Sequence, residues 1–186
     1  MVTEYHKNVT DGIYEAGKEF LKLKKIKKVY TGDQKPLSIV DSHTKLVVNY
    51  KPDVHFKLKN NKKMIFEVLD SESNKQDILI ADVIRSFLVE DVDAVIFVYY
   101  QPEKEELKKD EKDKETKSVE KRILEALVTI SKGLIGKGIN QDEIPFEKSG
   151  TLKIDKKNGA DKEWVKKRIM EEYFCTPKKI NANKKG

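Results

Sequence analysis

The stretch PDVHFKLKNNKKMIFEVLD, residues 52–70, contains the pattern that decides the fold. Apolar and polar residues alternate over 53–58, and an apolar segment rich in strand-forming residues follows over 62–70. The apolar positions that share one face of these two strands are Val54, Phe56, Leu58, Met64, Phe66 and Val68. An Asn-Asn turn separates the strands, so the stretch predicts an antiparallel hairpin.

The register of this hairpin follows from its apolar face, since a slip by one residue would turn every side chain to the other side. A loop of residues 60–62 meets this condition. It places His55 opposite Glu67 and Asp53 opposite Leu69, which makes Asp53 a diagonal neighbour of Glu67. Diagonal neighbours lie about 7–8 Å apart at the backbone. Two carboxylates at that separation can share one cation.

Elements on both sides of the hairpin complete an α/β pattern. Ser73 and Gln76 match a capping box that starts a helix, and the continuous apolar run after it indicates a strand buried on both faces. The other predicted strands cover 37–40, 45–50, 93–100 and 151–155, and the predicted helices cover 11–30, 73–89, 118–134 and 161–174.

The length of 186 residues fits one domain with an extended tail. We expect residues 1–100 to form the core and 118–176 to be a helical part of the same domain. Residues 101–117 are expected to be an exposed insertion or loop, because 103–117 are charged at all positions except Leu107 and Thr116. Residues 177–186 are expected to be a mobile basic tail.

Charged residues make up 38% of the chain, and its net charge is +6. The ends are basic, with +3 over 1–30 and +7 over 148–186, whereas 31–147 carries −4. This distribution fits a protein that holds a polyanion at its edges and a cation at its centre. It also fits ordinary solvated lysine-rich surfaces.

The single cysteine, Cys175, excludes a disulfide framework and a four-cysteine zinc site. A lone thiol is typical of a reducing compartment, so we expect a cytoplasmic protein. No apolar run approaches the ~18 residues of a membrane span, and the first residues lack the apolar core of a secretory signal. No membrane partner is therefore expected.

The chain resembles the PD-(D/E)xK nuclease superfamily. The resemblance rests on Pro52-Asp53, the hairpin, Glu67 within an apolar strand, and the helix and buried strand that follow. The resemblance covers roughly residues 11–100. It implies a restriction-endonuclease-like core, in which a mixed central sheet is flanked by helices in the order αβββαβ, here with C-terminal helical additions. The motif is divergent, because Leu69 stands where the family has lysine and the second half reads EVL.

The resemblance implies a metal-dependent DNA endonuclease of restriction or repair type, with Mg²⁺ or Mn²⁺ as cofactor. Asp53 and Glu67 would be metal ligands and catalytic residues, and Glu19 of the first helix would be a further ligand. Lys75 is the nearest replacement for the missing lysine. A divalent cation suits this chemistry because it activates water and stabilises the charge that develops on the phosphate.

Other roles stay open. A relative that has lost its lysine would bind nucleic acid without cutting it, and a third possibility is a scaffold protein that uses residues 103–135 as its contact element. His55 is a candidate ion-pair partner or proton carrier. A homodimer is expected, because two-fold symmetry suits the cleavage of two antiparallel strands.

Overall fold

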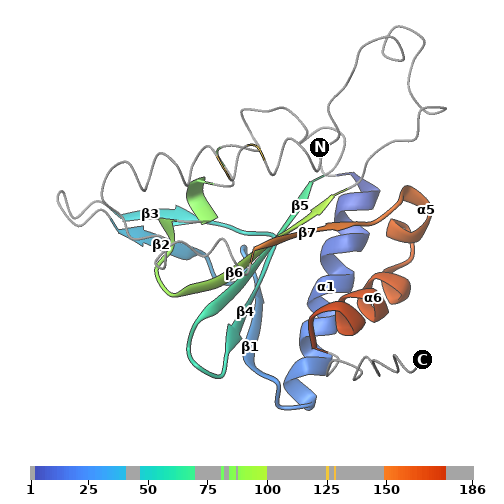
Figure 1. Ribbon diagram of the computed structural model, residues 1–186, viewed down its shortest axis with the longest axis horizontal. Helices are drawn as coiled ribbons and strands as arrows, with labels where there is room; N and C mark the ends of the chain where they lie inside the picture. Colours follow the sequence, from blue (N-terminus) through green and yellow to red (C-terminus); the bar gives the residue numbers. More distant parts are fainter. Residues whose placement is uncertain are drawn as a thin grey trace, which may run out of the picture.

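The computed structural model describes residues 3–40, 47–69, 81, 84–86, 88–99, 125, 128 and 149–174 (Figure 1). These residues contain a five-stranded mixed sheet in the order β1-β4-β5-β6-β7 and a separate two-stranded sheet, β2-β3. β4 pairs antiparallel with β1 on one side and with β5 on the other, and β6 and β7 continue the sheet parallel to β5. The strands are β1 Ile26–Thr31, β2 Leu37–Val40, β3 Val47–Tyr50, β4 Val54–Leu58, β5 Lys63–Leu69, β6 Val92–Tyr99 and β7 Gly150–Lys153. The α/β class is therefore confirmed.

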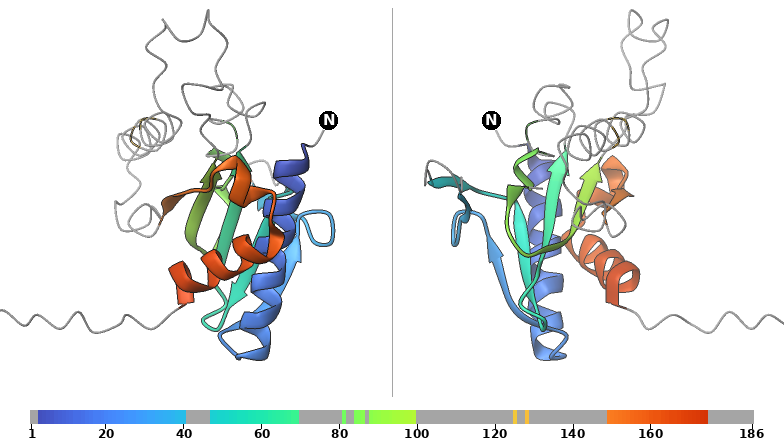
Figure 2. Two further views of the ribbon diagram at one scale, coloured as in Figure 1. Left: turned by 90° about the vertical axis from the view of Figure 1, so that its right-hand side faces the viewer. Right: turned by 60° about the vertical axis from the view of Figure 1, so that its left-hand side comes forward.

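Helices cover one face of the sheet. α1 (Glu4–Lys22) and α6 (Lys162–Phe174) pack side by side there, and the short α5 (Lys156–Gly159) leads into α6 (Figures 1 and 2). The core on this face includes Val9, Ile13, Phe20, Phe56, Phe66 and Ile169. The opposite face carries a second apolar cluster, to which the β2-β3 hairpin contributes Leu37 and Tyr50.

The first helix begins and ends earlier than the predicted 11–30. Thr3 caps it, accepting a hydrogen bond from the backbone N–H of His6 at 3.1 Å, and it ends at Lys22. The prediction was wrong for the last residues of the range, because Ile26–Thr31 forms β1.

A β-bulge explains that error. Ile26 and Val29 are both buried in the same core cluster, three residues apart, which reads as helical spacing in the sequence. In β1 the register with β4 shifts at Lys27, so both side chains reach one face of a strand. The helix ends without glycine or proline, because Lys24 itself takes the left-handed conformation with φ 53°.

The β4-β5 turn begins one residue earlier than predicted. The Leu58 N–H donates to the carbonyl of Lys62 at 2.8 Å, which closes a loop of residues 59–61. Asn61 has φ 69°. A three-residue hairpin loop needs a left-handed residue at its last position, and Asn adopts that conformation more readily than Lys. The predicted loop, 60–62, would have placed Lys62 there.

The earlier turn shifts the register by two residues and leaves the faces unchanged. His55 lies opposite Ile65, so its predicted pairing with Glu67 was wrong. The last observed pair is Val54 with Phe66. Extending this register by one residue places Asp53 opposite Glu67 and not opposite Leu69. The two acidic residues are direct cross-strand neighbours and not diagonal ones.

The other predicted strands agree with the structure. Those over 37–40 and 45–50 correspond to β2 and β3, and those over 93–100 and 151–155 correspond to β6 and β7. The described C-terminal part is therefore not only helical, since β7 adds a strand to the sheet before α5 and α6.

Two predicted helices are described only in part. Residues 81, 84–86 and 88 of the predicted helix 73–89 are helical, as are residues 125 and 128 of 118–134. Ile84 was expected on the apolar stripe, but it is exposed, whereas Ser86 is fully buried. The charged segment 101–117 and the tail 177–186 lie outside the described residues. No helix in the described part of the chain has the length and apolar content to cross a membrane.

Close packing explains the glycines of α1. A Cβ at Gly12 would lie 2.7 Å from Cβ of Val165 in α6, so this glycine lets the two helices approach. Tyr5 also ties α1 to the C-terminal part, because its hydroxyl donates to the carbonyl of Ile154 at 3.1 Å.

Gly17 gives a test of this packing. A Cβ there would lie 2.6 Å from Cγ2 of Val29 and 2.7 Å from Cε1 of Phe56. Gly17→Ala should lower the free energy of unfolding by about 1–2 kcal/mol, because overpacking outweighs the ~1 kcal/mol gain in helix propensity. Urea denaturation measures the change. The exposed neighbour Lys18→Ala should stay within about 0.5 kcal/mol of wild type, and a stabilised Gly17→Ala protein would contradict the prediction.

Candidate active site

The segment before β4 positions Asp53. Lys51 and Pro52 cross directly over Gly32, where a Cβ would lie 2.3 Å from the carbonyl oxygen of Pro52. The residue that follows β1 must therefore lack a side chain. This close crossing brings Asp53 to the end of the sheet, beside the first turns of α1.

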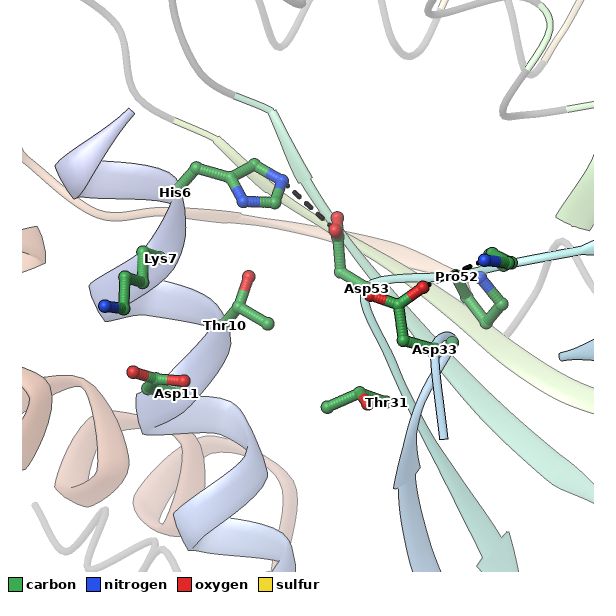
Figure 3. A pocket seen from close by; sticks show the side chains of 10 residues that line it. His6, Lys7, Thr10, Asp11, Thr31, Asp33, Pro52 and Asp53 are labelled. Atoms are coloured by element: carbon green, nitrogen blue, oxygen red, sulfur yellow. Dashed lines mark hydrogen bonds and ion pairs between the residues drawn. The ribbon is translucent and has the colours of Figure 1, made fainter. Parts of the chain in front are cut away.

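Two groups fix the Asp53 carboxylate. Its Oδ2 accepts a hydrogen bond from the backbone N–H of Val68 at 2.7 Å. Its Oδ1 lies 3.1 Å from Nε2 of His6 on α1, and both side chains are 21% exposed (Figure 3). The carboxylate is therefore oriented and still reached by solvent.

Glu67 lies one strand away in a more buried position, 6% exposed. Its Oε1 accepts a hydrogen bond from the hydroxyl of Tyr50, and that hydroxyl is also 2.9 Å from Oγ of the buried Ser86. Its Oε2 receives a longer contact, 3.5 Å, from the backbone N–H of Asp53. These donors offset part of the cost of burying a carboxylate.

A pocket of about 320 Å³ opens beside Asp53. It lies between the first turns of α1 and the ends of β1 and β3, and Figure 3 shows His6, Thr10 and Asp53 around it. Oγ1 of Thr10 is buried and has no hydrogen-bond partner among the described residues. Asp33 and Lys51, on the far side, form an ion pair at 3.0 Å. The pocket thus offers polar groups of both signs.

The structure does not bring Glu19 to this site. Its carboxylate pairs with Lys22 at 3.0 Å and with Lys166 of α6 at 3.5 Å. The hydrogen bond from Lys22 lowers the pKa of Glu19, and the ion pair with Lys22 keeps the carboxylate charged. Glu19 lies thirteen residues after His6, so about 20 Å of helix separates them.

The remaining predicted residues have different positions. Lys75 and Cys175 lie outside the described residues. Leu69 is 2% exposed and packs in the second apolar cluster, so the position of the motif lysine is a core position here.

Sequence reasoning missed His6, Tyr50 and Ser86. His6 was left outside the predicted helix, although Thr3 and the apolar spacing from Val9 onward could have indicated an earlier start. Tyr50 and Ser86 carry no local signal, because their roles depend on the contact between the β2-β3 hairpin and Glu67.

His55 is buried on the same sheet face as Glu67, with 2% of its surface exposed. Its ring stacks on Tyr30 with centroids 5.3 Å apart, and its Nδ1 has no hydrogen-bond partner among the described residues. Burial, together with the charges of Lys35 and Lys63, lowers the pKa of His55 to about 4. His55 is therefore neutral at pH 7.

This histidine should make the protein sensitive to acid. Between about pH 6.5 and pH 4 the unfolded state binds a proton that the folded state does not, so stability falls as the pH falls through this window. The loss should reach about 3 kcal/mol at the lower end. Urea denaturation of wild type and His55→Phe, which keeps an aromatic ring beside Tyr30, measures it. The variant should lack this loss, and parallel stability curves for the two proteins would contradict the prediction.

The donor set suits a hard divalent cation. Mg²⁺ takes oxygen ligands and keeps several waters, so two carboxylates can suffice. Asp53 and Glu67 provide these oxygens, each oriented by hydrogen bonds. The described parts of the chain hold no cluster of three or more His, Cys, Asp or Glu side chains placed to hold a metal ion.

Comparison with protein-family models, with curated proteins and with solved structures gives no match for this chain.

Proposed function

We propose that this chain is a metal-dependent endonuclease that hydrolyses DNA phosphodiester bonds beside Asp53 and Glu67. The observation that carries the proposal is that Asp53 and Glu67 are cross-strand neighbours at one end of β4 and β5, where the Asp53 N–H lies 3.5 Å from Oε2 of Glu67. The order of elements adds support, since α1, three antiparallel strands and a parallel fourth strand match the αβββαβ order of the family, with β2-β3 inserted.

The protein groups have distinct roles in this proposal. Asp53 and Glu67 would hold Mg²⁺ or Mn²⁺, which would supply an activated water and a counter-charge for the phosphate. The Val68 N–H and His6 orient Asp53, and the Tyr50 hydroxyl orients Glu67. The pocket between α1 and Asp53 gives the reacting phosphate access from solvent.

Incubation with plasmid, single-stranded and branched DNA tests this function. Cleavage should require Mg²⁺ or Mn²⁺, stop on addition of EDTA, and be lost in Asp53→Asn. Cleavage that persists undiminished in that variant, or no cleavage of any substrate, would refute the proposal. The proposal also includes a homodimer that acts in the cytoplasm, and analytical ultracentrifugation tests the oligomeric state.

The second candidate function is nucleic-acid binding without catalysis. The burial of Leu69 favours it, because no lysine can reach the site from that position. Titration calorimetry separates the two candidates. A nuclease should bind Mg²⁺ more tightly than its Glu67→Gln variant, whereas a degenerate site should show no such difference.

A further inference from the structure

Three lysines lie in a row across neighbouring strands. Lys28 of β1 is directly opposite Lys57 of β4, and Lys57 is directly opposite Lys63 of β5. Adjacent strands are about 4.8 Å apart, so the row places three positive charges within about 10 Å at the backbone. Like charges at directly opposed positions destabilise a sheet. The arrangement therefore costs the free protein stability.

Little in the described structure compensates this cost. Lys63 donates to the carbonyl of Glu90 at 2.6 Å and lies 4.0 Å from a carboxylate oxygen of Asp91. Lys28 and Lys57 have no carboxylate partner among the described residues. Lys28 and Lys57 are therefore available to bind an anionic partner.

Further lysines surround the row. The turn between α1 and β1 contributes exposed Lys24 and Lys25, and the β4-β5 turn contributes exposed Lys59. Lys27, at the β-bulge, donates to the side-chain oxygen of Asn61 at 2.8 Å and so joins the two turns. Lysines therefore gather at this end of the sheet, where Asp91 and Asp93 pair with Lys63 and Lys62.

The row has a fixed position relative to Glu67. Lys63 and Glu67 are four residues apart on β5 and therefore share one face, about 13 Å apart along the strand. A DNA duplex rises ~3.4 Å along its axis for each nucleotide of one strand, so this distance corresponds to about four nucleotides when the duplex axis runs along β5.

We propose that Lys28 and Lys57, with the surrounding lysines, bind the phosphate backbone of duplex DNA about four nucleotides from the bond that is cut. The position relative to the cut rests on the proposed function. A polyanion relieves the repulsion within the row, which explains why the sheet retains it.

The salt dependence of DNA binding tests this inference. Fluorescence anisotropy with a labelled duplex, in EDTA to prevent cleavage, compares wild type with Lys28→Gln/Lys57→Gln. The matched control is Lys156→Gln/Lys157→Gln, which removes the same charge from exposed positions of α5. The row variant should reduce the slope of log affinity against log salt by about 1.8 and weaken binding about tenfold, with the control within about twofold of wild type.

A second measurement separates binding from folding. Lys57→Gln should raise the thermal midpoint of the free protein while it weakens DNA binding. A lysine with only a structural role would not move these two quantities in opposite directions.

The possible outcomes are distinct. Equal slopes for the two double variants, or tight binding of an acidic peptide in place of DNA, would overturn the inference. If wild type binds through the row but never cuts, the lysine row stands and the nuclease proposal fails. If wild type cuts DNA and the row variant binds it with an unchanged salt slope, the nuclease proposal stands and the lysine row is not the DNA contact.

Discussion

Glu67→Gln should lower the rate of Mg²⁺-dependent DNA cleavage by about 100-fold or more, which corresponds to about 2.7 kcal/mol of lost transition-state stabilisation. The amide is close in size to the carboxylate and keeps an oxygen that can accept from Tyr50. It removes the negative charge that would hold the cation. Initial rates on supercoiled plasmid, measured at several Mg²⁺ concentrations, give the effect.

Glu19→Gln is the matched control. The family resemblance implies Glu19 as a metal ligand, whereas the structure pairs it with Lys22 and Lys166 at the other end of α1. Its cleavage rate should stay within about twofold of wild type, because it touches neither carboxylate. Equal losses in both variants would support the ligand set expected from the family and contradict the structure.

Phe66→Ala should produce the largest loss of stability, about 3–5 kcal/mol. Phe66 is fully buried next to Glu67 in the sequence, with its side chain on the α1 and α6 face. Its ring lies 4.9 Å from that of Phe56 and 5.7 Å from that of Tyr173 in α6. Truncation would therefore leave a cavity between the sheet and the last helix, and urea denaturation measures its cost.

Phe66→Leu separates the cavity from other effects. Leucine refills most of the volume, so this variant should lose less than half as much stability as alanine. Equal losses would mean that the aromatic contacts, and not the filled volume, stabilise this part of the core. A loss below about 1 kcal/mol in Phe66→Ala would show that α6 does not pack here as described.

The sequence was a good guide where side-chain alternation is regular. The faces of β4 and β5 and the buried strand β6 were predictable. Burial on one face gives alternating apolar and polar residues, and burial on both faces gives a continuous apolar run. β1 was not predictable, because the bulge at Lys27 gives a strand the spacing of a helix. The end of α1 could not be predicted either, because Lys24, and not a glycine, adopts the left-handed conformation that ends the helix.

The candidate site was predictable only in its two acidic residues. Glu67 interrupts an apolar run, so it needed a partner, and Pro52-Asp53 matched the family motif, although the predicted register was two residues off. The groups that orient them come from other elements. His6 is far from the hairpin in the sequence, and only the packing of α1 brings it to Asp53. Tyr50 lies just before the stretch 52–70, but its contact with Glu67 depends on how the β2-β3 hairpin packs against the sheet.

The contact between α1 and α6 has a consequence for biosynthesis. The surface around Gly12 that accepts Val165 has no partner until the ribosome has made almost the whole described chain. At roughly 5–20 residues per second, the interval between these two residues is about 8–30 s. During that time the side of α1 that faces α6, and the part of the sheet that α6 covers, remain open to solvent or to a chaperone.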